Sequence, residues 1–240
     1  MLGLIFGSAG NALIDRLPRK ESWFKGRSKC DKCGHELGFW DLIPVVSYLW
    51  LKGKCRYCHF PIPIRNLIVE LVIGMGFVLL QNPLLCGIFW VTVIVAVMDF
   101  ETQLVSDVMI MIWGILVLVL NSPLIPLLNS RGGNLAGGGV LGVVVAVGII
   151  GGIAFFSKER AMGWGDVEIA VVMGWWLGWP KILPGLWMAF VLGGIWGAIL
   201  LLRQKAKMQT KMAFGPWLVL GSWIGVLWGD MIIGWIGFQF

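Results

Sequence analysis

Charged residues are scarce in this chain. Only 13% of its 240 residues are Asp, Glu, Lys or Arg, whereas soluble domains carry about 25%. Hydrophobic residues make up 58% of the sequence, and several apolar runs approach the roughly 20 residues that a membrane-crossing helix requires. The low charge excludes an ordinary soluble domain, and the apolar runs indicate a polytopic membrane protein.

The sequence also lacks a basic face interleaved with aromatic residues, so its net charge of +6 does not indicate a nucleic-acid partner. Eleven of the 19 basic residues lie between Arg16 and Arg65, and most of the others lie in two short segments between apolar runs. Basic residues gather in this way on the inner side of a membrane, where they also attract anionic lipid. We therefore expect the lipid bilayer as a partner and no nucleic acid.

The N-terminus has no basic segment and no convincing cleavage site, which argues against a signal peptide that is removed. Residues 1–14 are apolar. As a helix they would extend about 21 Å, short of the roughly 30 Å hydrocarbon core. We expect a short first membrane helix here.

Seven further apolar segments follow, and with residues 1–14 they predict an all-α polytopic membrane protein with about eight transmembrane helices. The segments are Leu67–Gln81, Leu84–Met98, Val108–Leu128, Gly137–Phe156, Val167–Trp179, Leu183–Leu202 and Ala213–Ile236. No internal repeat and no second soluble domain is recognisable. We expect three parts: the first helix (1–14), a cytoplasmic zinc-binding loop domain (15–66) and a membrane domain of about seven helices (67–240).

Glycine and proline mark the expected connections. Asn82-Pro83 predicts a first outer hairpin, and Pro123 and Pro126 are expected to bend or end the fourth helix. The segment 131–139 contains five glycines, which favours a flexible outer loop.

This topology can be checked against the basic residues. If residues 16–65 lie inside, alternation of the helices places 17 of the 19 basic residues on the inner side. The same alternation places Asp99 and Asp166 at the inner ends of their helices. Two carboxylates at one depth can meet, so we expect the active site near the cytoplasmic face.

The long polar segment carries four of the five cysteines. They form two Cys-x-x-Cys pairs, Cys30/Cys33 and Cys55/Cys58, with 21 residues between the pairs. This spacing is close to that of a zinc ribbon, and a cytoplasmic loop disfavours the competing disulfides. The sequence therefore predicts a structural zinc site with four thiolate ligands. His35 and His59 lie beside the pairs and are alternative ligands, although we expect them at the surface, and Cys86 is expected only to pack.

Two aspartates are the candidate catalytic residues. Asp99 closes an apolar run, and Asp166 follows the active-site loop that contains Gly163 and Gly165. Alone, Gly-x-Gly-Asp more often marks a tight turn and a helix N-cap. An aspartate at the edge of a hydrocarbon layer, however, usually has a partner or a task. Paired carboxylates share a proton and can activate water as a base and protonate a carbonyl oxygen as an acid.

Helix polarity suggests how the two roles divide. The positive N-terminal end of its helix favours an ionised base at Asp166, and the negative C-terminal end of the helix that Asp99 closes favours a protonated acid there. Three further acids, Glu101, Asp107 and Glu168, are expected beside this pair, where they can meet a basic substrate.

Several motifs resemble those of bacterial type IV prepilin peptidases, and the resemblance runs over nearly the whole chain. It rests on the Gly-x-Gly-Asp loop, on Asp99 followed eight residues later by Asp107, on the four-cysteine loop and on five short segments. These are Gly7-Ser8-Ala9-Gly10-Asn11, Arg16-Leu17-Pro18, Trp40-Asp41-Leu42-Ile43-Pro44, Arg65 with Val69-Glu70-Leu71, and Phe214-Gly215-Pro216. Three features depart from the family pattern: Ser106 replaces a usual proline, Glu168 replaces a usual lysine, and the leading Gly-Ser-Ala-Gly replaces a usual Gly-Ser-Phe-Leu.

The resemblance implies a bifunctional enzyme. Such enzymes remove the short basic leader of prepilins or pseudopilins at the cytoplasmic face of the bacterial inner membrane. Many then methylate the new N-terminal amine with S-adenosylmethionine. The family's catalytic aspartates correspond to Asp99 and Asp166, and its zinc ligands to the four cysteines. The resemblance implies Arg65 and Glu70 in methyl transfer; from the residues alone, the default interpretation of Glu70 is a side chain at the lipid edge.

Three alternatives remain open. A transporter or proton relay would also use intramembrane carboxylates, but its acids are expected at mid-depth rather than at one face. A zinc-bearing scaffold would not need the Gly-x-Gly-Asp loop. A presenilin-like protease would share the aspartate pair but not the cysteine loop. The sequence does not identify the client pilin or the oligomeric state.

Overall fold

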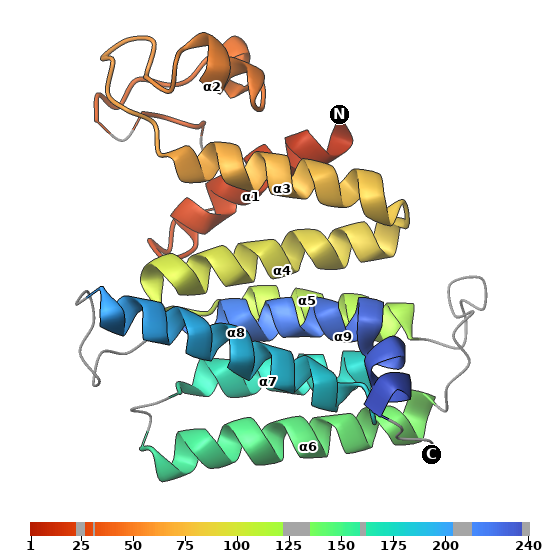
Figure 1. The fold of residues 1–240 in the computed structure, drawn as a ribbon. Coiled ribbons are helices and arrows are strands. Elements are labelled where there is room, and N and C mark those ends of the chain that lie inside the picture. Colours follow the sequence, from red (N-terminus) through yellow and green to blue (C-terminus); the bar gives the residue numbers. More distant parts are fainter. Residues whose placement is uncertain (23–26, 31, 122–134, 159–161, 204–212, 237–240) are drawn as a thin grey trace. The chain divides into compact units, whose positions relative to one another are not determined.

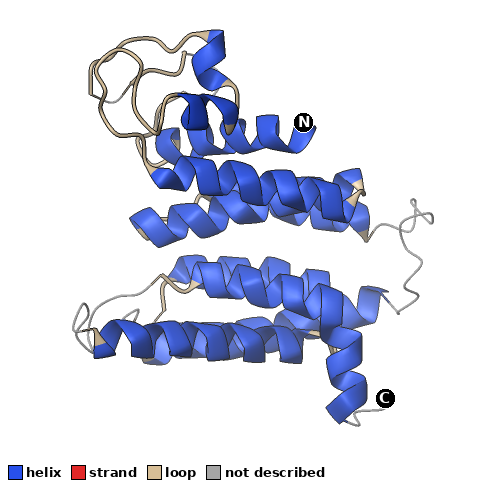
Figure 2. Ribbon diagram, turned by 45° about the horizontal axis from the view of Figure 1, so that its top comes forward, coloured by secondary structure: helices blue, strands red, loops and turns tan. Residues whose placement is uncertain are grey.

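The computed structural model describes the whole chain except residues 23–26, 31, 122–134, 159–161, 204–212 and 237–240. The described residues are mainly helical, and the only β pairing among them is two isolated bridges, Lys29 with Glu36 and Lys54 with Pro61 (Figure 2). A helix occupies each of the eight apolar segments expected from the sequence. The all-helical class is therefore confirmed for this part of the chain.

Contacts divide the chain into two compact units, Met1–Ile94 and Val95–Phe240. The first unit contains α1 (Leu2–Arg16), α3 (Ile64–Leu80) and most of α4 (Pro83–Thr102). Its polar loop carries the short helices η1 (Phe39–Leu42) and α2 (Val46–Trp50).

Helices α1 and α3 pack side by side in the first unit (Figure 1). Gly7 allows this close approach, because a Cβ atom there would lie 2.7 Å from Cα of Glu70. Farther along, the indole Nε1 of Trp90 donates a 2.7 Å hydrogen bond to the carbonyl of Phe6. The expected hairpin is present: Gln81 takes a left-handed conformation, and Oδ1 of Asn82 accepts hydrogen bonds from the first turn of α4.

The second unit contains five further helices, and α7 is its central one. They are α5 (Asp107–Leu120), α6 (Leu135–Phe156), α7 (Trp164–Leu177), α8 (Ile182–Leu202) and α9 (Gly215–Ile236). Helix α7 packs against the other four, and nine of its 14 residues are buried. The ring of Trp176 meets those of Trp113 and Trp223 edge-on, which fixes α7 between α5 and α9.

Four helices of the described residues are long and apolar enough to cross a membrane. They are Pro83–Thr102, Gly138–Phe156, Ile182–Leu202 and Gly215–Trp235. Large apolar side chains also face outward on the helices, including Val78, Leu79 and Trp235. These features support a multi-pass membrane protein, as the composition predicts.

Helix α5 ends at Leu120, and the N–H of Asn121 closes its last turn on the carbonyl of Val117. Residues 122–128 of the expected segment lie outside the described residues. One expected boundary is wrong. Helix α6 begins at Leu135, so the second half of the expected loop 131–139 is helical. Glycine lowers helix propensity in water, but apolar surroundings favour the helix because it satisfies every backbone polar group. Pro123 and Pro126 lie outside the described residues.

Candidate active site and cysteine cluster

Asp99 lies in the last turn of α4, and its side chain is buried, at 5% exposure. Its Oδ2 atom accepts a 2.9 Å hydrogen bond from the backbone N–H of Gly215. Gly215 is the first residue of α9, and Pro216 follows it at a position where helices tolerate proline. A Cβ atom at Gly215 would lie 2.7 Å from the same oxygen, so only glycine permits this approach.

Asp166 is the third residue of α7 and is buried, at 7% exposure. Its Oδ2 atom accepts a 3.1 Å hydrogen bond from the N–H of Gly163, the residue that precedes the helix. The carboxylate therefore satisfies one free donor of the helix N-terminus, as the simplest interpretation of Gly-x-Gly-Asp predicts. It also lies at the positive end of the helix.

The structure brings these two carboxylates within range of electrostatic interaction. They come from the end of α4 and the start of α7, 67 positions apart in the sequence. Burying two like charges together is unfavourable unless the pair shares a proton. The arrangement can therefore supply one carboxylate and one carboxylic acid to a bound molecule.

The two glycines of the active-site loop differ in their surroundings. A Cβ atom at Gly165 would lie 2.9 Å from Cγ2 of Val105, in the connection between α4 and α5. At Gly163 the nearest atom to such a Cβ is 4.0 Å away. Gly165 therefore permits close packing under Asp166, whereas Gly163 has room for a side chain.

The three neighbouring acids are exposed and lie near helix ends, one C-terminal and two N-terminal. Glu101 lies in the last turn of α4, Asp107 begins α5, and Glu168 lies in the first turns of α7. The carboxylates of Asp107 and Glu168 are close enough to repel each other. This end of the second unit therefore presents negative charge to solvent.

The four paired cysteines form one cluster in the first unit. All four sulfur atoms lie within 4.8 Å of one another, and the Sγ atoms of Cys30 and Cys58 are 3.7 Å apart. Tetrahedral zinc with Zn–S bonds of about 2.3 Å requires sulfurs about 3.8 Å apart. The donor set and its spacing therefore fit a closed, structural metal site.

The two Cys-x-x-Cys turns have the same backbone geometry. The N–H of Cys30 donates to the carbonyl of His35, and the N–H of Cys55 donates to that of Phe60. Gly34 and His59 occupy equivalent positions, both with left-handed φ values, +69° and +56°. Backbone N–H groups of Cys33 and Lys32 lower the pKa of Cys30 to about 7, which favours the thiolate that binds metal.

Both histidines of the chain lie outside this cluster. Among the described residues, the group that could hold a metal contains only the four cysteines. The ring of His35 lies against that of Tyr57, with ring centroids 3.7 Å apart. His59 serves as the left-handed residue of its turn. Cys86 is buried in α4, as expected for a packing residue.

Glu70 and Arg65 lie on α3 and connect it to the polar loop and to α1. Oε2 of Glu70 accepts a 2.7 Å hydrogen bond from the N–H of Val45, a β-branched residue with φ of +64°. Arg65 forms a 2.8 Å ion pair with Asp15 at the end of α1. Glu70 is thus half-buried and engaged by the loop.

Two participants were not assigned from the sequence. Gly215 belongs to the Phe-Gly-Pro motif. The only sequence feature that points to its role as a backbone donor is a Gly-Pro pair at the start of a helix. Val45 has a positive φ, a conformation that valine rarely adopts. Its residue type therefore gives no indication of this conformation in the sequence. A third feature, the buried and unpaired Oδ1 of Asn11, also emerges only from the structure.

Comparison with known proteins gives a consistent result. Residues 1–82 match the bacterial peptidase A24 N-terminal domain, and residues 86–198 match the type IV leader peptidase family. Relatives described as prepilin leader peptidase/N-methyltransferase include those of Aeromonas salmonicida strain A449, Dickeya chrysanthemi and Pseudomonas aeruginosa. The Aeromonas salmonicida relative is 31% identical, over 98% of this chain and 91% of its own. The Dickeya chrysanthemi relative is 32% identical, over 98% and 93%, and the Pseudomonas aeruginosa relative is 30% identical, over 97% and 90%. No solved structure matches the chain. The chain therefore belongs to the type IV leader peptidase family.

Proposed function

We propose that this protein is a membrane aspartic endopeptidase that removes the basic leader of prepilins or pseudopilins. The observation that carries the proposal is the pair of buried aspartates, Asp99 and Asp166, each held by a backbone N–H group. The family match and the names of the relatives support the same activity and do not favour a transporter. We further propose that the enzyme methylates the new N-terminal amine with S-adenosylmethionine, as the relatives' names suggest.

In this mechanism Asp166 is the base and Asp99 the acid. The helix N-terminus at Asp166 stabilises its ionised form, which takes a proton from water as the oxygen attacks the scissile carbonyl. The carboxylic acid of Asp99 protonates the carbonyl oxygen. Collapse of the tetrahedral intermediate breaks the C–N bond, and a proton passes to the leaving amine. Hydrogen bonds to the Oδ2 atoms hold both side chains in place.

We place this site near the cytoplasmic face of the bacterial inner membrane. This placement assumes that all eight apolar segments cross the membrane, in which case 17 of the basic residues lie on the inner side. The exposed acids Glu101, Asp107 and Glu168 would then meet a basic leader before cleavage. In this proposal the first helix spans residues 1–14, the zinc loop spans 15–66, and the membrane protease domain spans 67–240.

A structural zinc ion is part of the proposal. Cys30, Cys33, Cys55 and Cys58 would hold it, and it would crosslink two ends of the polar loop. Because four protein ligands close the coordination sphere, the metal would supply folding energy rather than chemistry. The same loop reaches Glu70 through Val45.

Asparagine substitutions of the aspartates test the protease mechanism. Asp99→Asn and Asp166→Asn each keep the shape of the side chain but remove an acid–base group. We expect cleavage of a synthetic prepilin in detergent to fall by orders of magnitude in each variant. Because the two carboxylates act as one unit, the double variant should be scarcely slower than either single one.

Mass spectrometry of the new N-terminus reads out both activities in the same reaction. Asp230→Asn serves as the matched control, because this aspartate has an exposed side chain and lies 15 residues beyond Gly215 on α9, away from the pair. Near-normal turnover by either asparagine variant would show that the substituted aspartate is only a helix cap or a structural partner, and it would end the proposed mechanism.

A further inference from the structure

The polar loop meets Glu70 through a strained turn. Val45 has φ of +64° and ψ of −50°, and the N–H of Val46 donates a 2.6 Å hydrogen bond to the carbonyl of Pro44. These three residues form a γ-turn with a positive central φ, which is the rare and strained form of this turn. Such a conformation persists only where its surroundings impose it. In this turn the N–H of Val45 donates a 2.7 Å hydrogen bond to Oε2 of Glu70.

Asp41 holds the segment that leads into this turn. It lies in η1, four residues before Val45, and its side chain is only 3% exposed. Its Oδ2 atom accepts a 3.1 Å hydrogen bond from the N–H of Gly38. Its Oδ1 atom lies 3.1 Å from Nε of Arg56 and forms an ion pair with it, although the two atoms are not aligned for a hydrogen bond. The guanidinium charge therefore compensates the burial of this carboxylate.

Arg56 belongs to a part of the loop that is tied to the start of α3. It lies within the second Cys-x-x-Cys pair, whose sulfurs belong to the cysteine cluster. Just beyond that pair the N–H of Ile62 donates a 2.8 Å hydrogen bond to the carbonyl of Gly53, and α3 begins two residues later. The ion pair with Asp41 therefore joins the part of the loop next to α3 to the part that carries Val45.

These contacts close a ring that begins and ends on α3. From the start of the helix the ring runs through the second cysteine turn to Arg56 and across the ion pair to Asp41. It continues along η1 to Val45, whose N–H returns to the helix at Glu70. If the ring were opened at the ion pair, Val45 could relax to a negative φ, which valine prefers. Its N–H would then turn away from Glu70.

We propose that Asp41 and Arg56 are positioning residues for methyl transfer: their ion pair holds Val45 in its strained turn, and this turn orients Glu70. The inference rests on the proposed methyl transfer and on the part that Glu70 takes in it. Neither residue contacts the methyl donor in this assignment, because both act through Val45. A metal held by the four cysteines would serve the same arrangement by fixing the turn that carries Arg56.

A general contribution to loop stability is the competing explanation. The two explanations predict opposite effects of Val45→Gly. Glycine adopts a positive φ readily, so this substitution removes the strain that the ion pair has to hold, but it also gives the unfolded loop more freedom. In a protein without the ion pair, Val45→Gly should therefore compensate if the pair holds the turn, and should cause further damage if the pair only stabilises the loop.

Asp41→Asn breaks the ion pair but keeps an oxygen that accepts the hydrogen bond from Gly38. Glu36→Gln is the matched control, because it breaks an exposed ion pair with Arg27 in the same loop. Methylation is assayed on a peptide that is already cleaved, with S-adenosylmethionine as donor. We expect Asp41→Asn to lower kcat for methylation about tenfold or more, while prepilin cleavage and zinc content stay near those of the unsubstituted protein. Glu36→Gln should change none of the three.

Val45→Gly is then combined with Asp41→Asn. We expect the combination to regain most of the methylation, whereas Val46→Gly, at the first position of α2, should restore none of it. A further loss of methylation on adding Val45→Gly would overturn the inference in favour of loop stability. An equal loss of cleavage and methylation in Asp41→Asn alone would overturn it as well.

Hydrogen exchange follows the turn without relying on enzyme activity. The amide of Val45 is bonded to Glu70 and should exchange slowly in the unsubstituted protein. Mass spectrometry of a short fragment around Val45 should show faster exchange in Asp41→Asn, as in Glu70→Ala, and no change in Glu36→Gln. Unchanged exchange in Asp41→Asn would refute the positioning role. If the unsubstituted enzyme does not methylate the cleaved peptide, the proposed methyl transfer fails, and hydrogen exchange still decides whether the ion pair holds the turn.

Discussion

The backbone N–H of Gly215 donates a hydrogen bond to Oδ2 of Asp99, a residue 116 positions away in the sequence. The bond ties the start of α9 to the last turn of α4. It also explains why the helix begins with Gly-Pro, since any Cβ atom at the first position would displace the carboxylate. A backbone group thus orients one of the two proposed catalytic acids.

Gly215→Ala should impair cleavage without unfolding the protein. The new methyl group would lie 2.7 Å from the Asp99 oxygen and would move the carboxylate. Small misplacements of catalytic groups cost up to about 100-fold in rate, and we expect a loss of that order in kcat. Gly234→Ala on the same helix is the control, because its Cβ direction is open. Unchanged kcat in Gly215→Ala would show that this contact does not position Asp99.

The two loop glycines should respond differently to alanine. Gly165→Ala places a methyl group 2.9 Å from Val105, whereas Gly163→Ala has space. We expect Gly165→Ala to lose most of its activity and Gly163→Ala to keep most of it. Adding Val105→Ala to Gly165→Ala should restore activity, because it removes the colliding methyl group. Peptide cleavage and thermal unfolding of these three variants measure this, and a failed rescue would contradict the packing explanation.

Zinc content should depend on the paired cysteines. Elemental analysis of the purified, unchelated protein should find about one zinc ion per chain. Cys30→Ser combined with Cys33→Ser should lose the metal and make the polar loop sensitive to protease, because binding energy at such a site is folding energy. Cys86→Ala, in the same unit but outside the cluster, should retain zinc. Metal-free native protein would disprove the site.

His59→Gly tests whether His59 is a zinc ligand or only the left-handed residue of its turn. The histidine holds a left-handed φ of +56°, as Gly34 does in the equivalent turn. Glycine there avoids a cost of about 1 kcal/mol, so zinc retention against a chelator should be unchanged or improved. Gly34→Ala should weaken retention for the converse reason. If His59→Gly releases zinc, the histidine is a ligand after all.

Glu70 is expected to serve methylation more than cleavage. Glu70→Ala removes the acceptor of the Val45 N–H bond, whereas Glu70→Gln retains an oxygen at the same place. We expect Glu70→Ala to reduce methylation of the cleaved peptide while cleavage continues. Glu70→Gln keeps the hydrogen bond from Val45 but removes the negative charge. It therefore distinguishes an effect of the loop's position from an effect of the charge. Equal loss of both activities in folded protein would argue against a separate methyl-transfer site.

Much of this architecture is predictable from the sequence. Apolar length locates eight helices, since lipid tolerates few other backbone structures, and the spacing of the cysteines anticipates their cluster. The sequence also singles out Asp99 and Asp166. Helix ends are less predictable: α6 begins inside a glycine-rich segment because its surroundings, rather than its propensity, decide the conformation.

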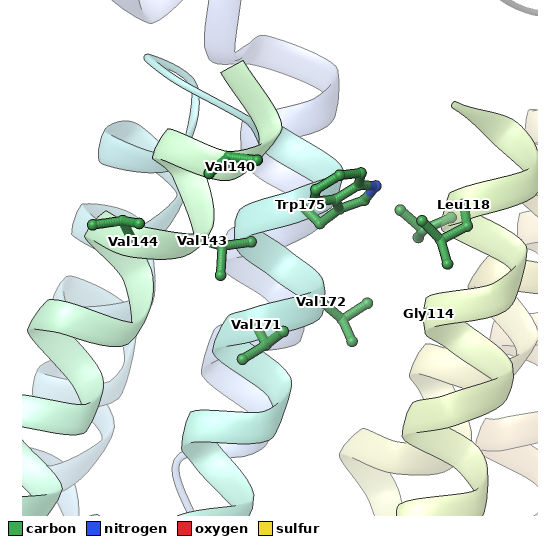
Figure 3. Close-up of a pocket in the computed structure, with 9 residues that line it drawn as sticks. Gly114, Leu118, Val140, Val143, Val144, Val171, Val172 and Trp175 are labelled. Carbon is green, nitrogen blue, oxygen red and sulfur yellow. The ribbon is translucent and has the colours of Figure 1, made fainter. Parts of the chain in front are cut away.

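Backbone contacts are the part that sequence reasoning does not reach. The bond from Gly215 to Asp99 and the bond from Val45 to Glu70 use N–H groups that every residue except proline possesses. Which of them meets a carboxylate depends on how distant helices pack. For the same reason, the apolar groove of about 340 Å³ between α5, α6 and α7 (Figure 3) has no signature beyond residues that any membrane helix contains.

The shortness of α7 has a consequence for the depth at which hydrolysis occurs. Its 14 residues extend only about 21 Å, and a typical hydrocarbon core is about 30 Å thick. Exposed to lipid, such a helix would force the bilayer to thin, but four neighbouring helices enclose it. At least one of its ends must therefore lie below the headgroups. In the proposed mechanism the peptide bond is cut at the end of α7 that carries Asp166, so a short enclosed helix would allow hydrolysis below the headgroups without a pore through the membrane.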